Sequence, residues 1–126
     1  MLKWVQGRSA NPDKPYFKIK LAESKWLMFD VYLLKYPEGS EIGWHKDPSQ
    51  AFFEHWRANI VLKKAIDGGK FACTYDIDGI VTEPVIRKWN DRFIVFRPDI
   101  TVHCVKQVKK GTRYVLSIGW LRGKIK

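Results

Sequence analysis

The stretch Trp44-His45-Lys46-Asp47-Pro48 holds residue types that can bind a metal ion. In an extended strand, side chains two positions apart point to the same face, so His45 and Asp47 would lie together and Lys46 would face away. One imidazole and one carboxylate make two thirds of a metal site. Two histidines and one carboxylate on one face of an iron leave coordination positions open, which suits non-haem Fe(II) oxygen chemistry. The missing ligand would be a second histidine from elsewhere in the chain.

Two further histidines are candidates for the missing ligand. His103 lies in the middle of Thr101–Val105, a segment of strand-forming residues, and an antiparallel sheet would bring it opposite His45. His55 lies in a connection between strands that we expect to face solvent. A histidine in a strand is more often an ordinary core residue than a ligand, so the spacing alone is a weak signal. His103 is the better candidate for the missing ligand beside His45 and Asp47, and an ordinary core histidine stays the alternative.

Arg113 follows His103 by ten residues and completes the set of residues that could act together. If 109–111 is a turn that pairs the segments on either side of it, His103 lies opposite Ser117 and Arg113 shares their face. A buried arginine needs an anionic partner, and residues 100–126 contain no aspartate or glutamate. A small dicarboxylate between Arg113 and the metal would satisfy both.

The elements that must hold these residues are strands. Segments with alternating or continuous apolar residues are 16–21, 26–36, 42–45, 57–64, 71–77, 80–86, 93–96, 101–108 and 112–121. Turn residues separate them, including the two-residue hairpin signal Asp78-Gly79. Only Ser49–Trp56 has a composition that suits a short helix. We therefore predict an all-β sandwich, jelly roll or barrel with few or no helices.

The composition fits one globular domain spanning residues 1–126. The net charge of +10 comes entirely from the two ends: residues 1–20 contribute +4, residues 100–126 contribute +7, and residues 21–99 contribute −1. Such a balance indicates a nucleic-acid partner or, equally, a solvated basic surface.

Other features exclude several classes of protein. No apolar run approaches the roughly 20 residues needed to cross a bilayer, and the segment after Met1 lacks the apolar stretch of a signal peptide. Two cysteines, Cys73 and Cys104, are too few for a disulfide framework. We expect a cytoplasmic protein without a membrane partner.

The chain resembles the Fe(II)- and 2-oxoglutarate-dependent dioxygenases, in particular the prolyl-4-hydroxylase-like branch. The resemblance spans about residues 30–121, and it rests on the order and spacing of its motifs. These are Tyr36-Pro-Glu-Gly39, Gly43-Trp-His45-Lys-Asp47, Arg57 before Ile60-Val-Leu62, Gly68-Gly69, Arg92-Phe-Ile-Val-Phe96-Arg-Pro98, His103-Cys-Val105, and Val108 before Gly111-Thr-Arg113-Tyr114.

This resemblance implies a double-stranded β-helix, a cupin-like jelly roll, with its core over residues 26–121. The first fifteen residues would form an irregular arm, since they contain Gly7, Pro12 and Pro15. The resemblance also implies that His45, Asp47 and His103 bind Fe(II).

The cosubstrate contacts follow from the same resemblance. It implies that Arg113 binds the distal carboxylate of 2-oxoglutarate and that ascorbate is a possible accessory reductant. Tyr36 lies nine residues before His45, near where relatives place a tyrosine that contacts the cosubstrate. Asn59 is a further candidate contact, although relatives often carry tyrosine or threonine in that region.

The activity implied is hydroxylation of a macromolecule, with a prolyl-type protein side chain favoured and a nucleobase second. The basic charge favours an acidic polypeptide or a nucleic acid over a small neutral metabolite. One alternative is a non-enzymatic basic β-domain that binds nucleic acid. Its contacts would be Lys106, Lys109, Lys110, Arg122, Lys124 and Lys126. Another is a cupin-like metalloenzyme that does not use 2-oxoglutarate, in which Arg113 would have no dicarboxylate to bind.

Overall fold

Strands and turns account for the secondary structure of the described part of the chain. The computed structural model describes residues 3–7, 13–47, 53–75, 86–89 and 92–123, and only the backbone of 73–75 and 86–89. These residues form strands and no helix, which confirms the predicted all-β class. The strands are β1 (Val5–Gln6), β2 (Phe17–Ser24), β3 (Phe29–Tyr36), β4 (Ile42–His45), β5 (Phe53–Lys63), β6 (Asp67–Gly68), β7 (Phe71–Tyr75), β8 (Ile86–Trp89), β9 (Phe93–Phe96), β10 (Thr101–Val105), β11 (Val108–Lys110) and β12 (Arg113–Gly123).

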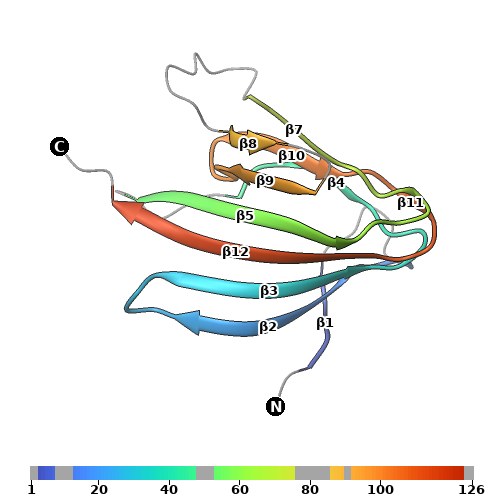
Figure 1. The fold of residues 1–126 in the computed structure, drawn as a ribbon, viewed down its shortest axis with the longest axis horizontal. Helices are drawn as coiled ribbons and strands as arrows, with labels where there is room; N and C mark the ends of the chain where they lie inside the picture. Colours follow the sequence, from blue (N-terminus) through green and yellow to red (C-terminus); the bar gives the residue numbers. More distant parts are fainter. Residues whose placement is uncertain (1–2, 8–12, 48–52, 76–85, 90–91, 124–126) are drawn as a thin grey trace.

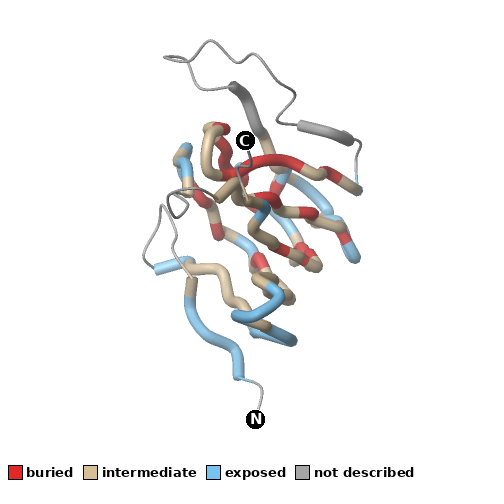
Figure 2. The backbone as a smooth tube through the Cα atoms, turned by 90° about the vertical axis from the view of Figure 1, so that its left-hand side faces the viewer, coloured by how far each residue is buried: buried red, intermediate tan, exposed pale blue. Residues whose placement is uncertain are grey.

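The strands form a large sheet and a small sheet that face each other as in a jelly roll (Figure 1). The large sheet has the order β1-β2-β3-β12-β5-β9-β8, and the small sheet has the order β4-β10-β7. A two-stranded ladder, β11-β6, lies at one end. Figure 2 shows the buried segments gathered in the middle, whereas β1 and much of β2 are exposed. The space between the two sheets is therefore where the core and the candidate site lie.

The central strand β12 explains how polar residues reach this interior. Its burial alternates along Arg113, Val115, Ser117 and Gly119, which face the small sheet, because successive side chains of a strand point to opposite faces. β12 pairs with β3 on one side and β5 on the other, so both of its edges are hydrogen-bonded. An apolar cluster fills one end of the interior. Its buried members are Tyr36, Ile42, Val61, Val105, Val108 and Val115.

The predicted hairpin between residues 101–108 and 112–121 is wrong. β10 pairs with β4 and β7, whereas β12 pairs with β3 and β5 in the other sheet. Between them the chain forms β11, which pairs with β6, and turns at Gly111 with φ +85°. Ser117 consequently lies opposite Tyr32 and Asn59 rather than opposite His103. Arg113 still lies in the interior between the two sheets, as His103 does, although the two strands do not pair with each other.

Two other local expectations also change. Phe53–Trp56 belongs to β5 and is extended rather than helical, whereas residues 49–52 lie outside the described residues. The hairpin signal Asp78-Gly79 lies outside them as well. In the N-terminal segment, Val5 and Gln6 pair with Lys18 and Phe17 of β2.

A helix able to cross a membrane is not found in the part of the chain that the structure describes.

Candidate metal centre

His45 and His103 come from two paired strands of the small sheet. β4 and β10 run antiparallel, and His45 is the direct partner of His103 across the ladder. The opposition expected from the sequence is thus present. Asp47 follows the end of β4, where its backbone N–H donates a hydrogen bond to the Pro98 carbonyl at 2.8 Å. That bond holds the segment after β4 beside the chain that leads into β10.

The three side chains converge on one point. Nε2 of His45 lies 3.5 Å from Oδ1 of Asp47, and Nε2 of His103 lies 3.4 Å from Oδ2. The two imidazole centroids are 4.3 Å apart. One possible ligand atom from each residue lies within 4.8 Å of the others. Two imidazole nitrogens and one carboxylate match the donor set that binds Fe(II) while leaving coordination positions open.

Backbone carbonyls orient both imidazoles toward this point. Nδ1 of His45 lies 2.7 Å from the Gly43 carbonyl, and Nδ1 of His103 lies 3.0 Å from the Thr101 carbonyl. A carbonyl only accepts, so each Nδ1 carries the hydrogen and donates it, which leaves the lone pair of a neutral ring on Nε2. Both Nε2 atoms face the Asp47 carboxylate. When both rings are neutral, three acceptor groups point at one another, an arrangement that a bound cation stabilises.

The environment of the centre is asymmetric. His103 is 5% exposed, and its ring contacts Phe71 and Phe96 at centroid distances of 5.9 and 5.2 Å. The side chain of Asp47 is 34% exposed to solvent, and that of His45 is 20% exposed. His103 is therefore more deeply buried than Asp47. All three candidate ligands, together with Phe71 and Phe96, line a cavity of about 310 Å³, here called the metal cavity.

Arg113 is buried at the start of β12, directly across from Tyr36 of β3. Its guanidinium lies 5.2 Å from the centroid of the Tyr36 ring. Burial lowers the pKa of Arg113, and the Tyr36 hydroxyl beside it acts in the opposite direction. Burial also raises the pKa of Tyr36 well above its usual range, so this phenol stays protonated at neutral pH. Arg113 is thus a buried cation next to a neutral hydrogen-bonding group, as a site for an anion requires.

Tyr36 connects Arg113 with the metal cavity. Its ring stacks on Tyr16 with centroids 5.0 Å apart and an interplanar angle of 18°. Tyr36 lines the metal cavity together with the three candidate ligands. The structure thus brings the predicted tyrosine to the same space as the metal centre.

Asn59 lies at the end of a hydrogen-bonded chain in the large sheet. Arg57 donates from Nη2 to Asp30 at 2.8 Å and from Nη1 to Ser117 Oγ at 2.7 Å. Ser117 Oγ in turn donates to Asn59 Oδ1 at 2.6 Å. This chain fixes the Asn59 amide, with its oxygen toward Ser117 and its NH₂ group as the donor on the other side. Sequence reasoning named Arg57 only as part of the resemblance and missed Asp30.

Gly119 is what allows Arg57 to lie in this position. A Cβ at Gly119 would overlap the Arg57 guanidinium and lie 3.1 Å from Asp30 Oδ1. Arg57 and Gly119 are direct partners of β5 and β12. The absence of a side chain at Gly119 therefore makes room for the guanidinium on the wall of the metal cavity. No pattern in a single sequence indicates that relation, because it joins two strands far apart in the chain.

His55 does not face solvent as expected. It is half-buried and lines the metal cavity from β5. Burial, followed by the nearby Arg57 charge, lowers its pKa. The group of three side chains with converging ligand atoms does not include His55.

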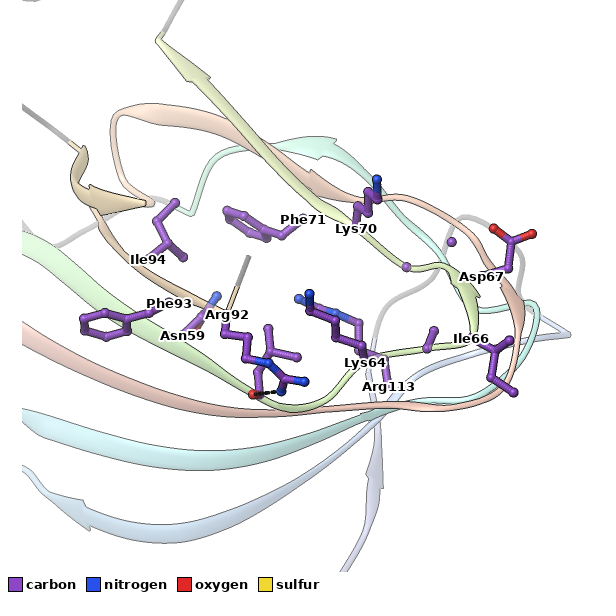
Figure 3. A pocket seen from close by; sticks show the side chains of 14 residues that line it. Asn59, Lys64, Ile66, Asp67, Lys70, Phe71, Arg92, Phe93, Ile94 and Arg113 are labelled. Carbon is purple, nitrogen blue, oxygen red and sulfur yellow. Dashed lines mark hydrogen bonds between the residues drawn. The ribbon is translucent and has the colours of Figure 1, made fainter. Parts of the chain in front are cut away.

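A second cavity, here called the cationic cavity, lies beside the metal cavity and has a volume of about 360 Å³. Arg113 lines this cavity and not the metal cavity. Asn59 and Phe71 line both, so they form the wall between the two. Figure 3 shows the residues of the cationic cavity, with Asn59 and Phe71 on one side and Arg113 on the other. The sequence predicted that Arg113 would be inside, but not that it would open to a space of its own.

Comparisons with known proteins identify the fold. No family model matches the chain, and no curated protein matches it in sequence. Solved structures match over nearly the whole chain. An oxidoreductase of the 2OG-Fe(II) oxygenase family from Burkholderia pseudomallei has 15% identity, covers 96% of this chain and 72% of its own, and gives a TM-score of 0.64.

A prolyl-4-hydroxylase from Pseudomonas putida is similarly related, with 15% identity, coverage of 94% and 77%, and a TM-score of 0.61. A cupin 2 conserved barrel domain protein from Rhodopseudomonas palustris has 10% identity, coverage of 98% and 74%, and the same TM-score of 0.61. The chain therefore has the cupin jelly-roll fold. At such identities the likeness to oxygenases and to plain cupins is one of fold, and the site itself must indicate the function.

Proposed function

We propose that this chain is an Fe(II)- and 2-oxoglutarate-dependent oxygenase. The observation that supports the proposal is the convergence of His45, Asp47 and His103, whose ligand atoms lie within 4.8 Å of one another. The donor set fits Fe(II), because it supplies two imidazole nitrogens and one carboxylate on one side of the metal. The likeness in fold to oxygenases adds to this support.

Each residue has a part in this proposal. His45, Asp47 and His103 hold the iron, Arg113 binds the distal carboxylate of 2-oxoglutarate, and Tyr36 and Asn59 donate hydrogen bonds to the cosubstrate. When bound, iron and 2-oxoglutarate supply the oxidation of a C–H bond by dioxygen, coupled to decarboxylation of the cosubstrate to succinate. The protein orients the reactants, and Phe71 and Phe96 give the metal cavity part of its apolar lining.

The proposed substrate is a macromolecule, with a prolyl-type protein side chain first and a nucleobase second. The net charge of +10 supports an acidic partner. Ascorbate is the proposed accessory reductant that keeps the iron in its ferrous state. The proposed location is the cytoplasm.

The first test is metal and cosubstrate binding in the absence of oxygen. Mn(II) is titrated into the protein and followed by electron paramagnetic resonance, and 2-oxoglutarate is then added. Binding of both, followed by succinate formation with Fe(II) and oxygen, supports the proposal. Metal binding without 2-oxoglutarate binding would instead indicate a cupin metalloprotein with another reaction. No metal binding would refute the metal centre.

A second candidate, a non-enzymatic nucleic-acid-binding domain, is favoured by one observation. Trp44 is 51% exposed, and the Lys106 ammonium lies 5.0 Å from its ring centroid. An exposed aromatic ring beside a lysine is a feature of surfaces on which single-stranded nucleic acids stack. Binding of a labelled single-stranded oligonucleotide that weakens steeply with salt and needs neither metal nor cosubstrate would favour this candidate.

A further inference from the structure

The cationic cavity has more positive charge than one carboxylate ligand requires. Buried Arg113 lines it, and the exposed residues Lys64, Lys70 and Arg92 surround it. The only carboxylate among its described lining residues is that of Asp67. Figure 3 shows Lys64 and Arg113 extending into the space between β5 and β7, with Lys70 and Asp67 at its edge. Exposed cations thus surround a buried one.

The metal cavity is balanced by contrast. Among its described lining residues are two cations, Lys18 and Arg57, and two carboxylates, Asp30 and Asp47. The Arg57 charge is paired with Asp30 at 2.8 Å. Before metal binding, the described lining residues of the cationic cavity therefore attract an anion more than those of the metal cavity do. A bound divalent ion adds two positive charges to the metal cavity, so a ligand with an anionic group at each end is attracted at both places.

The wall between the cavities separates Arg113 from the metal centre. Asn59 and Phe71 border both spaces, whereas Arg113 borders only the cationic cavity and Tyr36 only the metal cavity. A ligand with an anionic group at each end that binds both Arg113 and the metal would therefore pass beside Asn59 and Phe71. One end would meet Arg113 and the other end the metal.

The turn at residues 67–70, which forms part of the rim of the cationic cavity, packs against Arg113. Gly68 and Gly69 both have positive φ, +77° and +74°. A Cβ at Gly69 would lie 3.3 Å from Cδ of Arg113, and a Cβ at Gly68 would overlap the Gln107 carbonyl. β6 and β11 hold the turn in place through the pairing of Gly68 with Val108. Gly69 therefore lets the turn lie close to the buried arginine, and Gly68 lets it lie close to the backbone of Gln107.

We propose that the cationic cavity is the entrance through which the dicarboxylate cosubstrate reaches Arg113, separate from the opening of the metal cavity through which the oxidised substrate approaches. This inference rests on the proposed function. Lys64, Lys70 and Arg92 raise the local concentration of the dianion and accelerate its association, and salt weakens that effect. Two openings allow the cosubstrate to exchange while a large substrate covers the metal cavity.

Binding of 2-oxoglutarate to the Mn(II)-loaded protein under argon tests the inference, with isothermal titration calorimetry as the readout. The double variant Lys64→Gln/Lys70→Gln removes two rim charges. The matched control Lys25→Gln/Lys63→Gln removes two exposed charges that do not line the cavity, one of them next to Lys64 in sequence. Asp67→Asn removes the opposing charge at the rim. Mn(II) affinity and thermal melting are measured for every variant.

The rim variant is expected to bind 2-oxoglutarate roughly tenfold more weakly near 20 mM salt, and the difference should shrink to about twofold or less near 500 mM. Asp67→Asn should bind more tightly at low salt. The control should stay within about twofold of the parent, and Mn(II) affinity should not change in any variant.

Equal weakening in the rim variant and the control would overturn the inference, because the net charge rather than the cavity would then attract the anion. An unchanged affinity in the rim variant would also overturn it and leave the proposed function standing. Failure of the parent protein to bind 2-oxoglutarate while it binds Mn(II) would refute the proposed function itself, together with the inference.

Discussion

The metal cavity and the cationic cavity share a wall, but they are built for charges of opposite sign. In the first, two imidazole Nε2 atoms and a carboxylate lie within 4.8 Å of one another, which is a set of ligand atoms for a metal cation. In the second, Arg113 and the lysines around it supply donors, with Asp67 as the one carboxylate among the described lining residues. A metal cation would stabilise the first arrangement, and an anion such as a carboxylate would stabilise the second.

The two cavities also differ in how their charges are held. Strand pairing and two backbone carbonyls fix the imidazoles of His45 and His103. The rim of the cationic cavity consists of long side chains on exposed segments. A coordination site depends on each ligand position, whereas several cations act on an anion together. A single change should therefore have a larger effect in the metal cavity than at the rim of the cationic cavity.

The largest effect is expected from a matched pair of carboxylate changes, one in each cavity. Asp47→Asn replaces the only carboxylate among the converging ligands, and we expect Mn(II) affinity to fall by about a hundredfold or more. Asp67→Asn should leave Mn(II) affinity unchanged. Titration followed by electron paramagnetic resonance measures both. Retained Mn(II) binding in Asp47→Asn would contradict the difference between the two cavities, because Asp47 would then not be a metal ligand.

The second effect concerns Arg113, which is 7% exposed. Arg113→Met keeps most of the volume and removes a buried cation, so the free energy of unfolding should stay equal or rise. Loss of charged hydrogen bonds to the distal carboxylate should weaken 2-oxoglutarate binding by about 1.5–3 kcal/mol. Lys18→Met removes a cation from the metal cavity and should change that affinity little. Calorimetry and thermal melting report the two quantities separately, and equal weakening by both changes would contradict the assignment.

The third effect tests how the large sheet supports the shared wall. Gly119→Ala places a methyl group where the Arg57 guanidinium lies, so the protein should lose about 1–3 kcal/mol of stability. Displacement of Arg57 should loosen the Ser117–Asn59 hydrogen bond and weaken 2-oxoglutarate binding by a few-fold. In an Arg57→Ala background the same alanine should cost much less stability. A double-mutant cycle by urea unfolding measures the coupling, and additive effects would show that the two residues do not interact.

Local patterns in the sequence were sufficient for the pair of strands that carries the two histidines, although not for the pairing of β10 with β7. The segment Ile42–His45 was predicted with the bounds that the structure has, and the alternation rule placed His45 and Asp47 on one face. The antiparallel opposition of His103 to His45 was also expected. These relations depend on residues close together in the chain or on simple pairing, which is why single-sequence reasoning reached them.

Relations across the large sheet could not be predicted in the same way. The short ladder of β11 with β6 separates β10 from β12, and nothing in the residues around Gly111 distinguishes that path from a hairpin. The cavity that a long side chain such as Arg113 enters depends on how Phe71 and Asn59 pack between the sheets. Alternation gives the face of a strand but not the partners on the other sheet.

The smallest expected effect is the sharpest check on the geometry of the metal centre. His55 lines the metal cavity, and its lowered pKa keeps the imidazole neutral at pH 7, so it is chemically able to bind a metal. It lies on the large sheet, however, outside the group in which ligand atoms converge. His55→Gln should therefore leave Mn(II) affinity within about twofold, whereas His45→Gln should abolish most of it. Loss of Mn(II) in His55→Gln and retention in His45→Gln would mean that the ion is held from β5, and the strand pairing of β4 with β10 would not define the site.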